Sequence, residues 1–153
     1  MPSTLTVDAA PRLDATLDFM RMLWTIENAL QSTSKRMAAR IGVTGPQRLV
    51  LKIVAKFPDI SAKEVAHLLR LHPSTVTGIL QRLVDKQLLS RDRHPADGRR
   101  ARLRTRAAAR PLIRGRKGTV ESAVARALAR MPRASVRGAR LVLSAIVDEL
   151  AIS

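Results

Sequence analysis

Apolar residues follow a helical spacing through the first third of the chain. From Arg12 to Ile41 they recur mostly at steps of three or four residues, which predicts one long amphipathic helix. Gly42 ends this helix, and Thr44 and Gln47 form the capping box of the next one, which Pro58 ends. The predicted buried stripe of this second helix is Leu49, Val50, Ile53, Val54 and Phe57.

Two further helices follow the same logic. Ser61 and Glu64 form a second capping box, and the short helix after them turns Val65, Leu68 and Leu69 inward. Pro73 can open another helix, over residues 73–87, because the missing N–H of proline is harmless at the first helical position. The apolar face of this helix is Val76, Ile79, Leu80, Leu83 and Val84. The opposite face holds Ser74, Thr77, Gly78 and Gln81, with Thr75 and Arg82 on its flanks.

The pattern changes between residues 88 and 105, where short alternating segments rich in arginine flank the dipeptide Asp97-Gly98. Asp-Gly between two such segments is the strongest local sign of a β-hairpin. The sequence therefore predicts a two-stranded hairpin with an arginine-rich tip. Two more helices are expected after it, over residues 106–131 and 135–150, with Pro132 between them. Their predicted inward residues are Leu112, Val120, Val124, Leu128, Met131, Val142, Ile146 and Leu150.

Charge narrows the choice of partner. The 153 residues include 28 Lys plus Arg against 12 Asp plus Glu, a formal net charge of +16. Residues 91–117 alone hold 11 basic and two acidic residues, so more than half of the excess lies at the predicted hairpin and just after it. Arginine binds phosphate bidentately, so a polyanion is expected. With only three aromatic residues, the chain lacks the rings that single-strand binders use for base stacking, which favours duplex DNA.

Several function classes lose support. The chain has no Cys, which excludes disulfides, thiol sensing and Cys-ligated zinc. His67, His72 and His94 lie far apart in unlike contexts, so neither a metal nor another cofactor is expected. Ser32 and Lys35 match the Ser-x-x-Lys pattern of acyl enzymes but lack its partner motifs, so we do not expect an enzyme. No apolar run reaches the ~18–20 residues of a membrane span, and we expect a cytoplasmic protein that does not bind membranes.

The predicted elements have the order of a winged helix-turn-helix: two capped helices, a third helix with a polar outer face, and a basic hairpin. The following segments resemble successive signatures of the multiple-antibiotic-resistance regulator (MarR) family: Thr44-Gly45-Pro46-Gln47-Arg48-Leu49-Val50-Leu51, Pro73-Ser74-Thr75-Val76-Thr77, Leu83 to Arg91, and Asp97-Gly98-Arg99-Arg100. The resemblance implies a mainly α fold with a small β-hairpin wing and a helical dimerisation region. It divides the chain into an N-terminal dimerisation helix (1–43), a winged helix-turn-helix DNA-binding lobe (44–105) and C-terminal dimerisation helices (106–153).

The same resemblance implies a homodimeric transcription regulator that binds double-stranded DNA, with repression as the expected direction and release by a small-molecule effector as an open possibility. Recognition helix 73–87 would enter the major groove of a pseudo-palindromic operator, with half-sites about 10–10.5 bp apart, and wing 88–105 would reach the flanking minor groove. The candidate DNA contacts are Ser74, Thr75, Thr77, Gln81, Arg82, Arg91, Arg93, Arg99 and Arg100. Asp97 would support the wing by bracing a neighbouring arginine.

Some alternatives stay open at this point. Met20 and Trp24 could line an effector pocket between the dimer region and the DNA-binding lobe, but packing or dimer contact is the favoured interpretation. Pro111 falls where the family's next helix should already have begun, so that helix starts late, near Arg110, or kinks there. A sequence-nonspecific architectural protein for nucleic acid is the alternative function, because it would need the charge but no choice of sequence.

Overall fold

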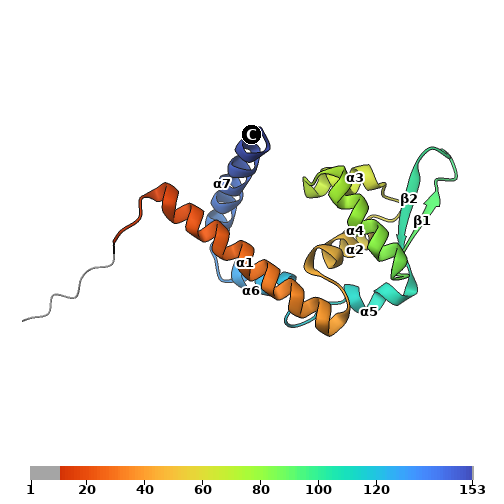
Figure 1. Cartoon of the computed structure of the whole chain (residues 1–153), viewed down its shortest axis with the longest axis horizontal. Coiled ribbons are helices and arrows are strands. Elements are labelled where there is room, and N and C mark those ends of the chain that lie inside the picture. The colour runs from red at the N-terminus through yellow and green to blue at the C-terminus, as the bar shows by residue number, and fades with distance from the viewer. Residues whose placement is uncertain (1–10, 153) are drawn as a thin grey trace, which may run out of the picture.

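The computed structural model describes residues 11–152, and it is mainly α-helical with one antiparallel hairpin, as the sequence predicts (Figure 1). The elements in order are α1 (Ala15–Ile41), α2 (Gly45–Lys56), α3 (Ala62–Leu69), α4 (Pro73–Asp85), β1 (Leu89–Arg93), β2 (Ala101–Thr105), the 3-10 turn η1 (Ala107–Ala109), α5 (Arg110–Ile113), α6 (Val120–Ala129) and α7 (Arg133–Ile152). Helices α2 to α4 and the hairpin form a lobe at one end of α1. Helix α6 lies beside the other part of α1, and α7 projects away from α1 at a steep angle (Figure 1).

Side-chain caps fix where the helices begin and end. Both predicted capping boxes are confirmed: Thr44 and Gln47 exchange hydrogen bonds at the start of α2, and Ser61 and Glu64 do so at the start of α3. The expected stop of α1 at Gly42 is also confirmed, because this residue adopts a left-handed φ of 80° that glycine tolerates best. The lobe is thus connected as the sequence predicts.

The hydrophobic core lies inside the lobe. Its fully buried side chains include Val50, Leu51, Val54, Val65, Val76, Leu80, Leu83, Leu89 and Leu103. Each such side chain contributes about 1.5–3 kcal/mol to folding relative to an exposed one. The predicted inward faces were too wide, because Leu49, Phe57 and Leu68 are 50%, 46% and 53% exposed. The buried face of α2 is shifted from the predicted one: it contains Val50 and Val54, as predicted, together with Leu51, which the prediction omitted.

The single helix predicted over residues 106–131 is wrong. Chain segment 110–113 forms the short helix α5, and a loop then separates it from α6. Pro111 does not cause this break, because it lies in the first turn of α5, where proline is tolerated. The helix begins at Arg110, which was one of the two expected outcomes. The break comes later, at a loop containing Gly115 and Gly118, and Gly118 has a φ of 75°.

The helices outside the lobe leave much of their apolar surface uncovered in one protomer. Met37 is the buried residue of α1, and α6 buries none. The predicted inward residues Val124, Leu128, Met131, Val142 and Leu150 are all exposed. Within residues 11–152 no helix is long and apolar enough to cross a bilayer.

Candidate nucleic-acid interface

Helix α4 presents a polar face at its amino-terminal end. His72 caps the helix, with its Nδ1 accepting a hydrogen bond from the backbone N–H of Ser74 at 3.2 Å. The Ser74 hydroxyl lies 2.7 Å from the same ring nitrogen, so this serine takes part in the cap. The outward residues Ser74, Thr75, Thr77, Gln81 and Arg82 are all exposed. Val76, Leu80 and Leu83 hold the opposite face in the core, which gives the helix a fixed orientation.

Gln81 is oriented by a neighbour on its own helix. Its Nε2 donates a hydrogen bond to Oδ1 of Asp85 at 2.8 Å, one turn further along. The second Nε2 hydrogen and the Oε1 acceptor remain for another partner. A side-chain amide held in this way can offer a donor and an acceptor side by side, which is what the major-groove edge of adenine requires.

The hairpin joins the lobe through Leu89 and Leu103, which are fully buried at its base. At its tip, Asp97 organises the backbone: its Oδ1 accepts from the N–H of Arg99 at 3.0 Å, and its carbonyl oxygen accepts from the N–H of Arg100 at 3.0 Å. The bracing expected of Asp97 is therefore found at the main chain of Arg99 and not at a guanidinium group.

Sequence reasoning missed two acidic residues that contact the hairpin from the lobe. Asp59, between α2 and α3, accepts hydrogen bonds from Nε and Nη2 of Arg104 at 2.6 and 2.9 Å, and it lies 3.9 Å from Nε of Arg102. Glu64 on α3 lies 3.5 Å from Nη2 of Arg100. Asp59 and Arg104 are 45 positions apart in the chain, so no local pattern indicates their contact.

These contacts keep the acidic residues ionised. The hydrogen-bonded Arg104 guanidinium lowers the pKa of Asp59, and Asp59 in turn raises the pKa of Arg104. The pKa of Glu64 is lowered first by the hydrogen bond from the backbone N–H of Ser61, with Arg100 adding a smaller effect. At neutral pH these carboxylates therefore carry their full charge beside the wing.

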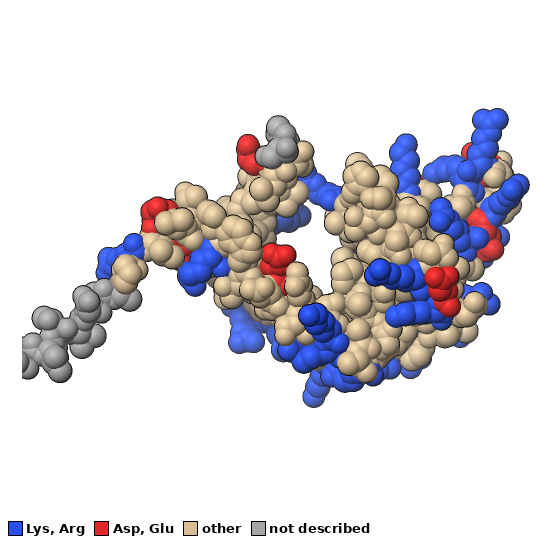
Figure 2. All heavy atoms as spheres, in the orientation of Figure 1, with Lys and Arg blue, Asp and Glu red and all other residues tan. Residues whose placement is uncertain are grey.

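The predicted DNA contacts on the hairpin thus fall into two groups. Arg100 faces a carboxylate of the lobe, whereas Arg91, Arg93 and Arg99 form no ion pair with any residue between 11 and 152. Figure 2 shows Lys and Arg crowded over the hairpin end of the molecule, with a few Asp and Glu side chains among them. The unpaired arginines are the ones available to an external anion.

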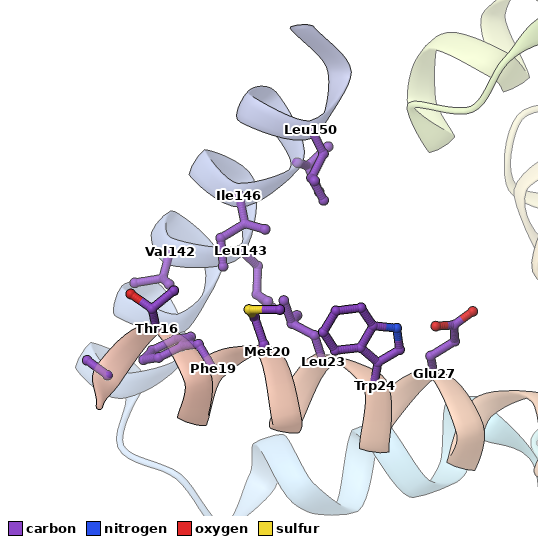
Figure 3. A pocket seen from close by; sticks show the side chains of 12 residues that line it. Thr16, Phe19, Met20, Leu23, Trp24, Glu27, Val142, Leu143, Ile146 and Leu150 are labelled. Carbon is purple, nitrogen blue, oxygen red and sulfur yellow. The ribbon is translucent and has the colours of Figure 1, made fainter. Parts of the chain in front are cut away.

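A separate hollow lies in the helical arm, the part of the molecule formed by α1, α6 and α7. An open groove of about 820 Å³ runs between α1 and α7, and its lining is almost entirely apolar (Figure 3). Met20 and Trp24 lie in it together with Phe19, Leu143 and Ile146 (Figure 3). The lining residues all come from α1 and α7, so the hollow is not the expected pocket between the dimer region and the lobe. No group of three or more His, Asp or Glu residues suited to a metal ion occurs within residues 11–152.

Residues 41–100 match the family model of the MarR family, over the segment that runs from the end of α1 to the tip of the hairpin. This segment, 60 of the 153 residues, is similar to the MarR family. A comparison with curated proteins gave no match. The matched segment contains α4, β1 and the hairpin turn, on which the predicted DNA contacts lie.

Solved structures match nearly the whole fold. The MarR transcription regulator of Oenococcus oeni shares 19% identity with this chain at a TM-score of 0.72, covering 86% of this chain and 99% of its own. The DNA complex of MepR from S. aureus matches at 14% identity and a TM-score of 0.71, covering 86% and 97%. The PcaV regulator of Streptomyces coelicolor, bound to its natural ligand, matches at 21% identity and a TM-score of 0.71, covering 90% and 97%. At these identities the likeness shows the fold, and it covers the helices outside residues 41–100 as well as the lobe.

Proposed function

We propose that this chain is a homodimeric, cytoplasmic transcription regulator of the MarR family that binds a pseudo-palindromic DNA operator and represses transcription. The observation that carries the proposal is the pairing of an exposed polar face on α4 with a hairpin whose Arg91, Arg93 and Arg99 have no acidic partner within residues 11–152. Helix α4 would enter the major groove and read base edges, while the hairpin would neutralise phosphates and reach the flanking minor groove. In this proposal the arginines of the hairpin supply affinity for DNA, and the uncharged polar face of α4 supplies sequence specificity.

The helical arm supports the dimer. The apolar groove between α1 and α7, with exposed leucines and valines around it, would be an unfavourable surface on an isolated protomer. A second copy of the same arm would cover it and place two copies of α4 on one side of the dimer. In this proposal residues 1–43 and 106–153 serve dimerisation and residues 44–105 bind DNA, and Met20 and Trp24 serve the dimer contact.

Release by a small molecule is a further part of the proposal. Its support is the likeness to regulators crystallised with ligands, such as PcaV with its natural ligand and a MepR-like protein with pseudoligands. Any effector would act by favouring a dimer in which the two copies of α4 no longer match the spacing of the half-sites.

Selection of bound fragments from the source genome, followed by sequencing, tests the function directly. A regulator should enrich a small set of related pseudo-palindromes and bind them at least about 10³-fold more tightly than random DNA at the same salt concentration. A flat profile across the genome would instead favour a sequence-nonspecific architectural protein, the role that the +16 charge alone would support.

The contribution of the wing tip has its own test. We expect Arg99→Ala to weaken binding to operator and random DNA alike and to reduce the slope of log K against log salt by about 0.9, because one phosphate contact fewer releases fewer counterions. Arg126→Ala is the matched control, since Arg126 is an exposed arginine on α6, outside the lobe. An unchanged slope for Arg99→Ala, measured by fluorescence anisotropy at several salt concentrations, would remove Arg99 from the interface.

A further inference from the structure

Asp59 is fixed beside the hairpin by its own backbone. It lies in the connection between α2 and α3 with a φ of 69°, a conformation that aspartate and asparagine tolerate better than most residues. Its N–H donates to the carbonyl oxygen of Leu103 at 3.0 Å, and the N–H of Leu103 donates to the carbonyl oxygen of Ile60 at 3.0 Å. Since Leu103 is fully buried, the Asp59 carboxylate is anchored against the edge of β2.

The carboxylate binds the arginines of β2 in the way that a phosphate would. Arg104 donates from Nε and Nη2 to the two oxygens of Asp59, the bidentate geometry that guanidinium groups also form with phosphate. Nε of Arg102 is buried, lies 3.9 Å from the same carboxylate, and has no hydrogen-bond partner among residues 11–152. Arg104 is therefore already occupied by an anion, and Arg102 is held close to it.

The strand register separates these arginines from the unpaired ones. Arg102 and Arg104 lie opposite Asp92 and Ser90, whereas Arg91 lies opposite Leu103 and Arg93 opposite Ala101. Residues that pair directly across two strands share a face of the hairpin, and successive residues alternate between the faces. Arg102 and Arg104 thus occupy one face, and Arg91 and Arg93 occupy the other.

We propose that Asp59 is an internal counter-ion and a positioning residue for the wing: it holds Arg104 and Arg102 away from DNA, so that the wing meets phosphates through Arg91, Arg93 and Arg99. The inference rests on the proposed DNA-binding function. It adds that only part of the positive charge of the hairpin is available to bind DNA phosphates. A wing with fewer available cations binds random DNA less tightly, which leaves a larger share of the discrimination to α4.

Two substitutions of hairpin arginines test this directly. Arg93→Gln should reduce the slope of log K against log salt by about 0.9, because it removes a phosphate contact. Arg104→Gln removes the same charge from the same hairpin but should leave the slope unchanged, since Arg104 contacts Asp59. An equal decrease for both variants overturns the counter-ion role and leaves DNA binding by the wing intact. No decrease for Arg93→Gln overturns both the inference and the wing's part in the proposed function.

The reverse experiment releases the held arginines. Asp59→Asn keeps the left-handed backbone accessible but removes the negative charge, so Arg104 and Arg102 should become available to phosphate. We expect tighter binding to random DNA, a slope steeper by about 0.9 for each arginine released, and a lower ratio of operator to random affinity. In the double variant with Arg104→Gln, the slope of log K against log salt should be lower by about 0.9 than in Asp59→Asn alone.

Asp18→Asn controls for net charge, because it removes one negative charge from α1, outside the lobe, and leaves the Asp59–Arg104 contact in place. It should preserve the ratio of operator to random affinity. An Asp59→Asn protein with unchanged slope and ratio overturns the inference. Should this variant fail to fold, as judged by circular dichroism, the comparison of Arg93→Gln with Arg104→Gln decides the question.

Discussion

At the scale of single residues, the exposed face of α4 contains one residue that takes part in the helix cap and another that is free to serve the proposed base reading. Ser74 shares the His72 cap at the start of the helix, whereas Gln81 lies two turns further on and is held by Asp85. Recognition gains from a side chain that is already oriented, because less rotamer freedom is lost when DNA binds. Gln81 is accordingly the outward residue of α4 best prepared to read a base.

We expect Gln81→Ala to weaken binding to the operator by about 1–3 kcal/mol, the range for a lost bidentate base contact, and to leave random DNA unaffected. Competition binding with both DNAs at one salt concentration measures the difference. Arg82→Ala is the useful comparison on the same helix, since loss of a phosphate contact would weaken binding to both DNAs. Equal losses on both DNAs for Gln81→Ala would rule out base reading by this residue.

Residue-level prediction succeeded where helical periodicity decides and failed where the partner is distant. The five outward residues of α4 could be predicted because a 3.6-residue period fixes which side faces the core. The pairing of Arg100 with Glu64 and of Arg104 with Asp59 could not, because it depends on how the hairpin packs against the lobe. The sequence indicated an arginine-rich wing and gave no sign that part of its charge is already balanced.

At the scale of elements, the loop between α5 and α6 is a tertiary junction. Arg48 on α2 is 2% exposed, and its Nη2 donates to the carbonyl oxygen of Arg114 at 2.7 Å and to Oε2 of Glu121 at 3.2 Å. Lys52 pairs with the same carboxylate. Glu121 thereby connects α6 to α2, the first helix of the lobe. The Nε and Nη1 atoms of Arg48 are buried and have no hydrogen-bond partner within residues 11–152.

These contacts explain why the helix predicted over residues 106–131 fails. Nη2 of Arg40 on α1 donates a hydrogen bond to the carbonyl oxygen of Lys117 at 2.8 Å. A Cβ atom added at Gly118 would lie 2.6 Å from Nη1 of Arg40, so the guanidinium group leaves no room for a side chain there. The loop is therefore shaped by α1 and α2, which are distant in sequence. Helical spacing of apolar residues on both sides of the loop gives no indication of such a break.

We expect Glu121→Gln to lower the free energy of unfolding by about 1–3 kcal/mol at pH 7, because it leaves the buried Arg48 without a counter-ion. The estimate stays below that for a fully buried pair, since Glu121 is partly exposed. Glu64→Gln is the control, because it removes the same charge while glutamine can still complete the capping box. Urea unfolding followed by circular dichroism measures both variants, and a loss no greater than that of the control would contradict the role of Glu121.

The same junction predicts a dependence on pH. Lys52, first by its hydrogen bond, and then Arg48 lower the pKa of Glu121 in the folded protein. The carboxylate therefore stabilises the fold above its ordinary pKa of about 4.3, and this contribution is lost as the pH falls through the lower folded-state pKa. The difference in stability between the native chain and Glu121→Gln should shrink toward zero in acid. A difference that stays constant between pH 7 and pH 3 would show that the effect comes from packing.

At the scale of the whole molecule, the densest positive charge and the apolar groove lie in different places. The hairpin end carries the concentrated arginines, and the arm formed by α1, α6 and α7 carries the uncovered leucines, valines and aromatic rings (Figures 2 and 3). This division suits a protein that binds DNA with one end and a second copy of itself with the other. It also means that the proposed dimer contact can be altered without changing the residues proposed to contact DNA.

Leu143→Glu makes that separation testable. Leu143 lines the groove between α1 and α7 and is 48% exposed in the protomer, so a charge there should leave the lobe folded and oppose burial against a partner. Leu49→Glu is matched in chemistry and exposure, at 50%, but lies on α2 away from the groove. Light scattering should find a mass near that of one chain for Leu143→Glu and twice that mass for Leu49→Glu.

The loss of the dimer should also weaken operator binding by more than about tenfold, or 1.4 kcal/mol, because each half-site must then be bound separately. Binding of the monomer to a single half-site should persist, since α4 and the hairpin are unchanged. A Leu143→Glu protein that remains dimeric would place the contact between protomers outside this groove. A monomer with undiminished operator affinity would instead show that the two half-sites are not read together.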